Sequence, residues 1–144
     1  MKKKITLVIT LILVALLSLL LISCTDPCES EGAQDYIKSF TITFEEFKDI
    51  FDLAESTSRI ALSPVISDMQ EVKRDLNGLE LPENCGKYGD MQEYSVETME
   101  KAIDAFMKFA QQEDDARVIS IIESVRTRFE YIENWIEETE ESFK

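Results

Sequence analysis

Apolar residues follow two patterns that divide the chain near residue 24. Residues 5–23 form a continuous apolar run without a charged residue. From Ala33 onward the apolar residues recur at intervals of three and four, with charged and polar side chains between them. This spacing places them on one face of an α-helix. The sequence therefore predicts an all-α domain over residues 33–144, behind a separate apolar segment.

Four helices are predicted in this domain, each with one apolar stripe. The first ends before the serine-rich segment 56–58, the second covers residues 59–76, the third runs from residue 88 to about 111, and the fourth starts at residues 114–115 and ends in the acidic stretch 137–141. The residues expected to face the core are Tyr36, Phe40, Phe44, Phe47, Phe51 and Ala54; Ile60 or Ala61, Val65, Met69, Val72 and Leu76; Met91, Met99, Ala102, Ile103, Phe106 and Ala110; and Val118, Ile119, Ile122, Val125, Phe129, Ile132 and Ile136.

Three local signals mark possible helix ends. A capping box begins at Thr43, which allows a helix start or a kink there. Ser63 is a potential cap, because Pro64 follows it in what would be the first turn. Gly78 is expected to end the second helix in the left-handed conformation.

The connections between consecutive helices are short, which makes the helices antiparallel neighbours. We therefore expect a four-helix up-down-up-down bundle. The alternative is a three-helix bundle, with the first two segments fused across Pro64. The starts of the first and third helices lie at the same end of a four-helix bundle, which would place Cys28 near Cys85.

The amino terminus carries a signal for export. Three lysines, residues 2–4, precede the apolar run, as in the n-region and h-region of a signal peptide. The run ends in Leu21-Ile22-Ser23-Cys24, which resembles the lipobox of bacterial lipoproteins. The resemblance implies that residues 1–23 are cleaved, that Cys24 is lipidated, and that residues 24–32 form a lipidated tether. The protein would then lie outside the cytoplasm, held to a membrane of the cell envelope by the lipid on Cys24.

An uncleaved transmembrane helix over residues 5–23 is the alternative, because about 20 apolar residues can span a bilayer. The lysine cluster would remain inside, so both interpretations place the domain outside the cytoplasm. We favour the lipoprotein because Cys24 lies where the apolar run stops.

Composition narrows the possible partners. Residues 24–144 form one small domain of about 120 residues. They contain 12 basic and 29 acidic residues, a net charge of −17. Nucleic acid and anionic lipid surfaces are therefore poor partners, and cationic ones are favoured.

Two further cysteines, Cys28 and Cys85, are expected to form a disulfide, because disulfides persist outside the cytoplasm. Free thiols, or a second lipid on Cys28, are the alternatives. A second resemblance covers the adjoining sequence: Leu79-Glu80-Leu81-Pro82, Cys85 and then Met99, Ile103, Phe106 and Phe109 resemble small helical bacterial lipoproteins of unassigned function. This supports the fold without assigning an activity.

No residue pattern indicates catalysis. The absence of histidine from the sequence removes the common nucleophile triads and most zinc or copper sites. Carboxylate pairs at Glu97 and Glu100, and at Glu137 and Glu140, are interpreted as solvated helix faces. Segment 111–115 could hold a divalent cation, but a loop leading into an acidic helix start is favoured. We therefore expect no enzyme, no metal and no cofactor.

The predicted function is that of a non-catalytic protein-binding or scaffold module at the membrane; the alternative is a structural or stress-related envelope protein without a specific ligand. A monomer is favoured. Dimerisation would need a second apolar stripe, for which the candidates are Ile50, Leu53, Ile60, Leu62, Ile66 and Ile121. The aromatic residues Tyr88, Tyr94, Tyr131 and Trp135 are expected to complete the core near the membrane, with headgroup or partner contact as the alternative.

Intact mass spectrometry of the protein extracted from its host membranes tests the anchor and the disulfide together. We expect a mass that starts at Cys24 and includes acyl chains, with Cys28 and Cys85 alkylated only after reduction. A mass that retains residues 1–23 would mean a transmembrane anchor instead.

Overall fold

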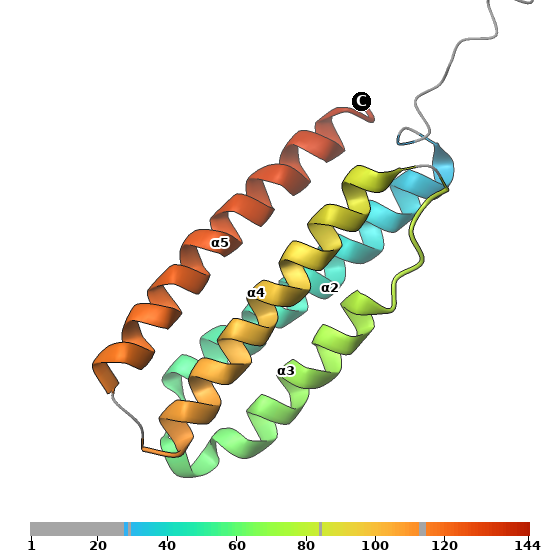
Figure 1. Ribbon diagram of the computed structural model, residues 1–144. Coiled ribbons are helices and arrows are strands. Elements are labelled where there is room, and N and C mark those ends of the chain that lie inside the picture. The colour runs from blue at the N-terminus through green and yellow to red at the C-terminus, as the bar shows by residue number, and fades with distance from the viewer. Residues whose placement is uncertain (1–27, 29, 84, 113–114) are drawn as a thin grey trace, which may run out of the picture.

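Four long helices make up the computed structural model, which describes residues 28, 30–83, 85–112 and 115–144. They are α2 (Glu31–Ser56), α3 (Leu62–Asn77), α4 (Gly86–Ala110) and α5 (Asp115–Glu141), with the short 3₁₀ helix η2 (Arg59–Ala61) before α3. Consecutive helices run in opposite directions, as Figure 1 shows. The four-helix bundle is therefore confirmed, and the three-helix alternative is wrong. The predicted signal segment (residues 1–23), Cys24 and most of the predicted tether (residues 24–32) lie outside the described residues.

Helix α2 begins two residues before the expected boundary at residue 33. Ser30 caps it, because its side-chain oxygen accepts a hydrogen bond from the backbone N–H of Ala33 at 3.2 Å. No new helix starts at Thr43: its hydroxyl donates to the Ser39 carbonyl at 3.0 Å, and α2 continues through this position. The helix start that the capping box allowed at Thr43 is therefore absent.

Gly78 ends helix α3, as predicted, but the start of the helix and the conformation of Gly78 differ from the prediction. Its cap is Ala61, at the end of η2, so Ser63 lies inside the helix rather than capping it. Pro64 still falls in the first turn, where a missing N–H is tolerated. Gly78 has a φ of −87°, which is not left-handed, and its N–H donates to the carbonyls of Arg74 and Asp75. In the described residues the left-handed position is Gln112, with a φ of 62°, just after α4.

Aromatic rings fill the space between α2 and α5, the first and last helices of the bundle. Phe129 of α5 meets Phe44, Phe47 and Phe51 of α2 edge to face, with ring centroids 5.5, 6.2 and 5.1 Å away. All four side chains are buried. Burying each contributes roughly 1.5–3 kcal/mol, and edge-to-face pairs add to this.

Several apolar residues face differently from the prediction. Ile60 and Ala61 are exposed because η2 shifts the register, and Leu62 is the residue that enters the core. Ile119 is also exposed, since its neighbour Val118 takes the inward position on α5. Ile66, a candidate together with Leu62 for a second apolar stripe, is buried as well. The supposed second stripe is therefore largely part of the core.

A disulfide joins Cys28 to Cys85, as predicted, with their Cα atoms 5.2 Å apart. Both residues are buried, and they link the start of α2 to the start of α4. We call this end of the bundle the disulfide end, and the opposite end, where α4 finishes and α5 begins, the tip.

Removing the crosslink should destabilise the fold substantially. The disulfide spans 57 residues, and in the chain-entropy model a loop of this length contributes roughly 4 kcal/mol by restricting the unfolded chain. We expect a Cys28→Ser/Cys85→Ser double variant to lose about this much free energy of unfolding in urea titrations. Reduced wild-type protein should match the variant. Equal stability of oxidised and reduced wild type would contradict the prediction.

Candidate functional site

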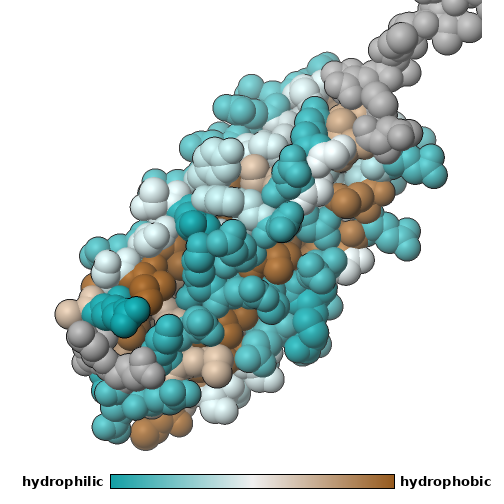
Figure 2. Space-filling model, viewed as in Figure 1, coloured by the Kyte–Doolittle hydropathy of each residue, from teal (hydrophilic) through white to brown (hydrophobic). Residues whose placement is uncertain are grey.

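Exposed apolar side chains concentrate at the tip. Ile60 is 98% exposed, Ile119 55%, Leu53 53% and Met107 38%. They come from the connection after α2 and from the tip-proximal turns of α2, α4 and α5, so all four lie far from the disulfide. Figure 2 shows apolar residues among the hydrophilic ones toward this end. Isolated exposed apolar residues are common, but several near one end indicate an interaction surface.

A groove of about 370 Å³ opens between α2, α4 and α5 at the tip, and we call it the tip groove. It lies where the aromatic filling of the α2–α5 interface ends, beyond Phe51 and Phe129. Its apolar lining consists of Ala54, Phe106, Phe109, Val118, Ile119 and Ile122, and its charged rim of Glu55, Glu123 and Arg126. A groove with an apolar lining and a few polar groups at its rim is typical of a binding site.

Arg126 connects the two helices beside the tip groove. Its guanidinium donates to Asp52 of α2 at 3.1 Å and also to Glu55, and it lies 5.4 Å from the centre of the Phe51 ring. Such partly exposed ion pairs contribute little to stability, but they fix the position of the rim. The Glu123 side chain has no ion-pair or hydrogen-bond partner among the described residues, so its carboxylate can pair with a group of the bound protein.

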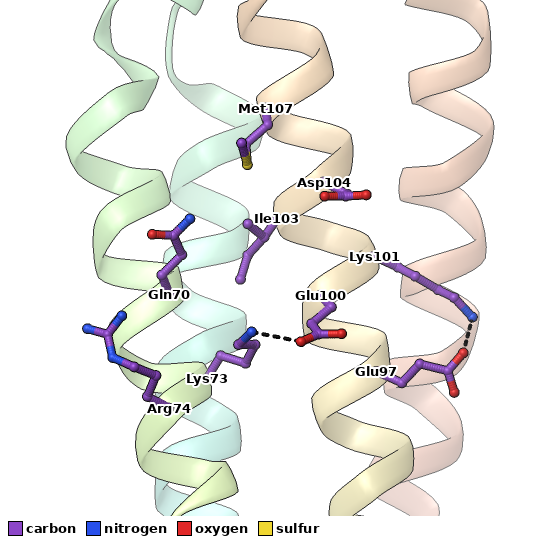
Figure 3. A pocket seen from close by; sticks show the side chains of 9 residues that line it. All are labelled: Gln70, Lys73, Arg74, Glu97, Glu100, Lys101, Ile103, Asp104 and Met107. Carbon is purple, nitrogen blue, oxygen red and sulfur yellow. Dashed lines mark hydrogen bonds and ion pairs between the residues drawn. The ribbon is translucent and has the colours of Figure 1, made fainter.

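A second groove, of about 500 Å³, lies between α3 and α4 and is lined by charged side chains (Figure 3). Lys73 of α3 donates to Glu100 at 2.8 Å across it, and Lys101 donates to Glu97 at 2.6 Å on the side toward α5. The bond from Lys101 lowers the pKa of Glu97, which is exposed. A catalytic acid needs a raised pKa, so this pair does not have the electrostatics of an acid-base centre.

The remaining acidic positions also lack the geometry of a metal centre. No cluster of three or more cysteine or carboxylate side chains suited to a metal occurs within residues 28–144 as far as the structure describes them. Glu137 and Glu140 are both exposed on α5. The possible cation site at segment 111–115 includes residues 113 and 114, which lie outside the described part.

A third groove, of about 450 Å³, runs between α4 and α5 toward the disulfide end, and we call it the aromatic groove. Its lining consists of Lys87, Asp90, Met91, Tyr94, Tyr131 and Trp135. The aromatic residues singled out in the sequence therefore divide into two groups. Tyr88 is fully buried in the core, as expected, whereas Tyr131 is 55% exposed in the groove.

Buried polar groups at the disulfide end form a satisfied network rather than a reactive one. The Tyr36 hydroxyl donates to the Gln92 side chain at 3.1 Å, and Gln92 in turn donates to the carbonyls of Leu76 and Leu79 at 2.8 and 3.2 Å. The Tyr88 hydroxyl donates to the Cys28 carbonyl at 2.7 Å. These bonds join α2, α4 and the end of α3, so their role is structural.

Comparisons with known proteins provide no relative. No family model, no curated protein and no solved structure matches the chain. No helix within the described ranges is long and apolar enough to cross a membrane. The geometry of the grooves is therefore the basis on which we infer a function.

Sequence reasoning missed the tip groove and identified part of the aromatic one. It placed Ile119 in the core, because a spacing of three and four residues does not decide which of two adjacent apolar residues on α5 faces inward. Leu53 was a candidate for a second apolar stripe, and this was the available signal for an exposed tip. Ile60 was also such a candidate, but it was expected in the core as the alternative to Ala61. Tyr94, Tyr131 and Trp135 were recognised as possible contact residues, and the structure brings them together.

Alkaline pH should destabilise the fold through Tyr36. Burial raises the pKa of its hydroxyl, and the nearby Tyr88 adds to the effect. The unfolded chain therefore releases this proton first, so the stabilisation is complete below the ordinary value of 10.0 and is lost as the pH rises above it. We expect the free energy of unfolding to fall above about pH 10 in the wild type, and less steeply in Tyr36→Phe.

Urea titrations at about pH 8 and pH 11 measure this difference. Tyr131→Phe is the matched control, because Tyr131 is exposed and should leave the wild-type pH dependence unchanged. The same loss of stability in the wild type and in Tyr36→Phe would rule out this origin.

Proposed function

We propose that the protein is a non-catalytic lipoprotein, held outside the cytoplasm by lipid on Cys24, whose tip binds another protein. One observation supports this most directly: four exposed apolar residues, Leu53, Ile60, Met107 and Ile119, lie with the tip groove at the end opposite Cys28. Cys24 is only four residues from Cys28 in the sequence. A lipid there would place the tip far from the membrane.

The length of the bundle makes this arrangement effective. Helix α2 has 26 residues, which corresponds to about 39 Å from the disulfide end to the tip. The disulfide end carries many exposed carboxylates, among them Glu31, Asp35, Glu137 and Glu138. Repulsion between these and anionic headgroups favours a bundle that stands away from the bilayer.

The tip suits a protein partner better than a substrate. Its groove offers an apolar lining with one unpaired carboxylate, Glu123, and no pair of groups that could exchange a proton with a ligand. A side chain inserted among Phe106, Phe109 and Ile122 would be desolvated on several sides, which is how a small interface gains most of its affinity.

Site-specific photo-crosslinking in intact cells tests the proposal. We expect a photoreactive residue at position 119 to form one discrete adduct, and the same residue at position 42 to form none. Ile42 is the matched control, because it is 59% exposed, close to the 55% of Ile119, but lies midway along α2. The adduct at position 119 should disappear in the variant Phe109→Glu, which places a charged side chain in the apolar lining of the groove.

The anchor is tested in the same cells. Cys24→Ser should release the protein from the membrane fraction and abolish the adduct. Equal labelling at positions 42 and 119, or no adduct at either, would contradict binding at the tip. An envelope defect in a deletion strain that Ile119→Glu still rescues would then favour the structural role without a ligand.

A further inference from the structure

The aromatic groove has the architecture of a second binding site, separate from the tip groove. Tyr94 of α4 and Tyr131 of α5 form its corner, with ring centroids 5.4 Å apart and ring planes at 73°. Trp135 forms the next wall, one helical turn from Tyr131, and is held by edge-to-face contacts with the buried rings of Phe40 and Tyr88. The core therefore preorganises the wall that Trp135 forms.

Hydrogen-bond donors are free along these walls. Among the residues that the structure describes, the hydroxyls of Tyr94 and Tyr131 and the indole N–H of Trp135 have no hydrogen-bond partner. The Lys87 ammonium makes no ion pair there and lies 5.5 Å from the centre of the Tyr88 ring. The Asp90 carboxylate is the one strong acceptor in the lining, and no described side chain forms an ion pair with it.

We propose that the aromatic groove binds a proline-rich segment of another protein, flanked by basic residues. A polyproline II segment has no internal hydrogen bonds, so its carbonyls need donors, and its prolines have no N–H to satisfy. Aromatic grooves recognise such segments by packing against proline rings while hydroxyl and indole groups donate to the carbonyls. The donor-rich lining of Tyr94, Tyr131 and Trp135 matches this chemistry.

Charge complementarity favours basic residues on either side of the prolines in the partner. Asp90 lies in the groove, and the exposed Glu138 follows Trp135 by one turn on α5, so it shares that face of the helix. The chain as a whole has a net charge of −14. A lysine or arginine beside the prolines would therefore be attracted by the net negative charge and would form an ion pair with Asp90 or Glu138 when the segment binds.

Other ligand classes fit this lining less well. Sugar hydroxyls donate as often as they accept, and Asp90 alone offers a strong acceptor to them. An acyl chain would cover the free donors of Tyr94, Tyr131 and Trp135 without bonding to them, which is unfavourable. The proposal depends on neither membrane anchoring nor the tip groove, so its failure would leave the proposed function intact.

Trp135 is the single tryptophan of the chain, so its fluorescence reports directly on the groove. The full chain in mild detergent is titrated with a peptide of alternating prolines and leucines that has lysines at both ends. We expect a saturable change in Trp135 emission. A peptide with alanine in place of proline, and one with glutamate in place of lysine, should each bind at least tenfold more weakly.

Variants locate the binding site. Tyr131→Ala should lower the affinity for the lysine-flanked peptide about tenfold, and Asp90→Asn should lower it about two- to fivefold. Ile119→Ala at the tip and Asp49→Asn on α2 are the matched controls, and both should retain wild-type affinity. Circular dichroism of each variant confirms that it has folded.

Four outcomes would overturn the proposal: no response to the proline-rich peptide, an equal response to the alanine or glutamate peptide, equal weakening by Ile119→Ala and Tyr131→Ala, or a response to a soluble N-acetylhexosamine oligosaccharide in place of the peptide.

Discussion

Packing of the Phe129 ring against three phenylalanines of α2 determines how the bundle closes. Helices α2 and α5 are the first and last of the four, and bulky rings rather than close backbone contact fill the space between them. Ion pairs bridge the same interface at its surface, from Lys48 to Glu133 and from Arg126 to Asp52 and Glu55. The separation that these rings impose continues to the tip, where the tip groove opens beside Phe106 and Phe109 of α4.

The two ends of the bundle are consequently built by different chemistry. A disulfide and buried hydrogen bonds through Tyr36, Tyr88 and Gln92 secure the end near the amino terminus. Apolar side chains such as Ile60 and Ile119 remain in solvent at the other end. A molecule that places its rigid crosslink at one end and its accessible apolar surface at the other is suited to attachment and recognition at separate places.

The sequence was sufficient for the elements that depend on periodicity. The phenylalanine stripe of α2, the number of helices and the pairing of Cys28 with Cys85 all follow from spacing and topology. The position of Ile119 did not, because Val118 and Ile119 both fit an apolar stripe and only the packed neighbours decide between them. Both grooves depend on distances between helices that are remote in sequence, which a local pattern does not determine. Whether the hydroxyls of Tyr94 and Tyr131 have a hydrogen-bond partner depends on the packed neighbours in the same way.

The crosslink between Cys28 and Cys85 also determines how the bundle would carry a mechanical load. A force applied to the chain before Cys28 is transmitted to α2 through the backbone and to α4 through the disulfide. Both helices therefore bear the force from the start. Helices α2 and α3 lie within the covalent loop that the disulfide closes, and they cannot be drawn out as an extended strand while the bond is intact. Tension between the amino terminus and the tip would therefore act in shear along the whole bundle, which resists rupture better than peeling one helix away at a time.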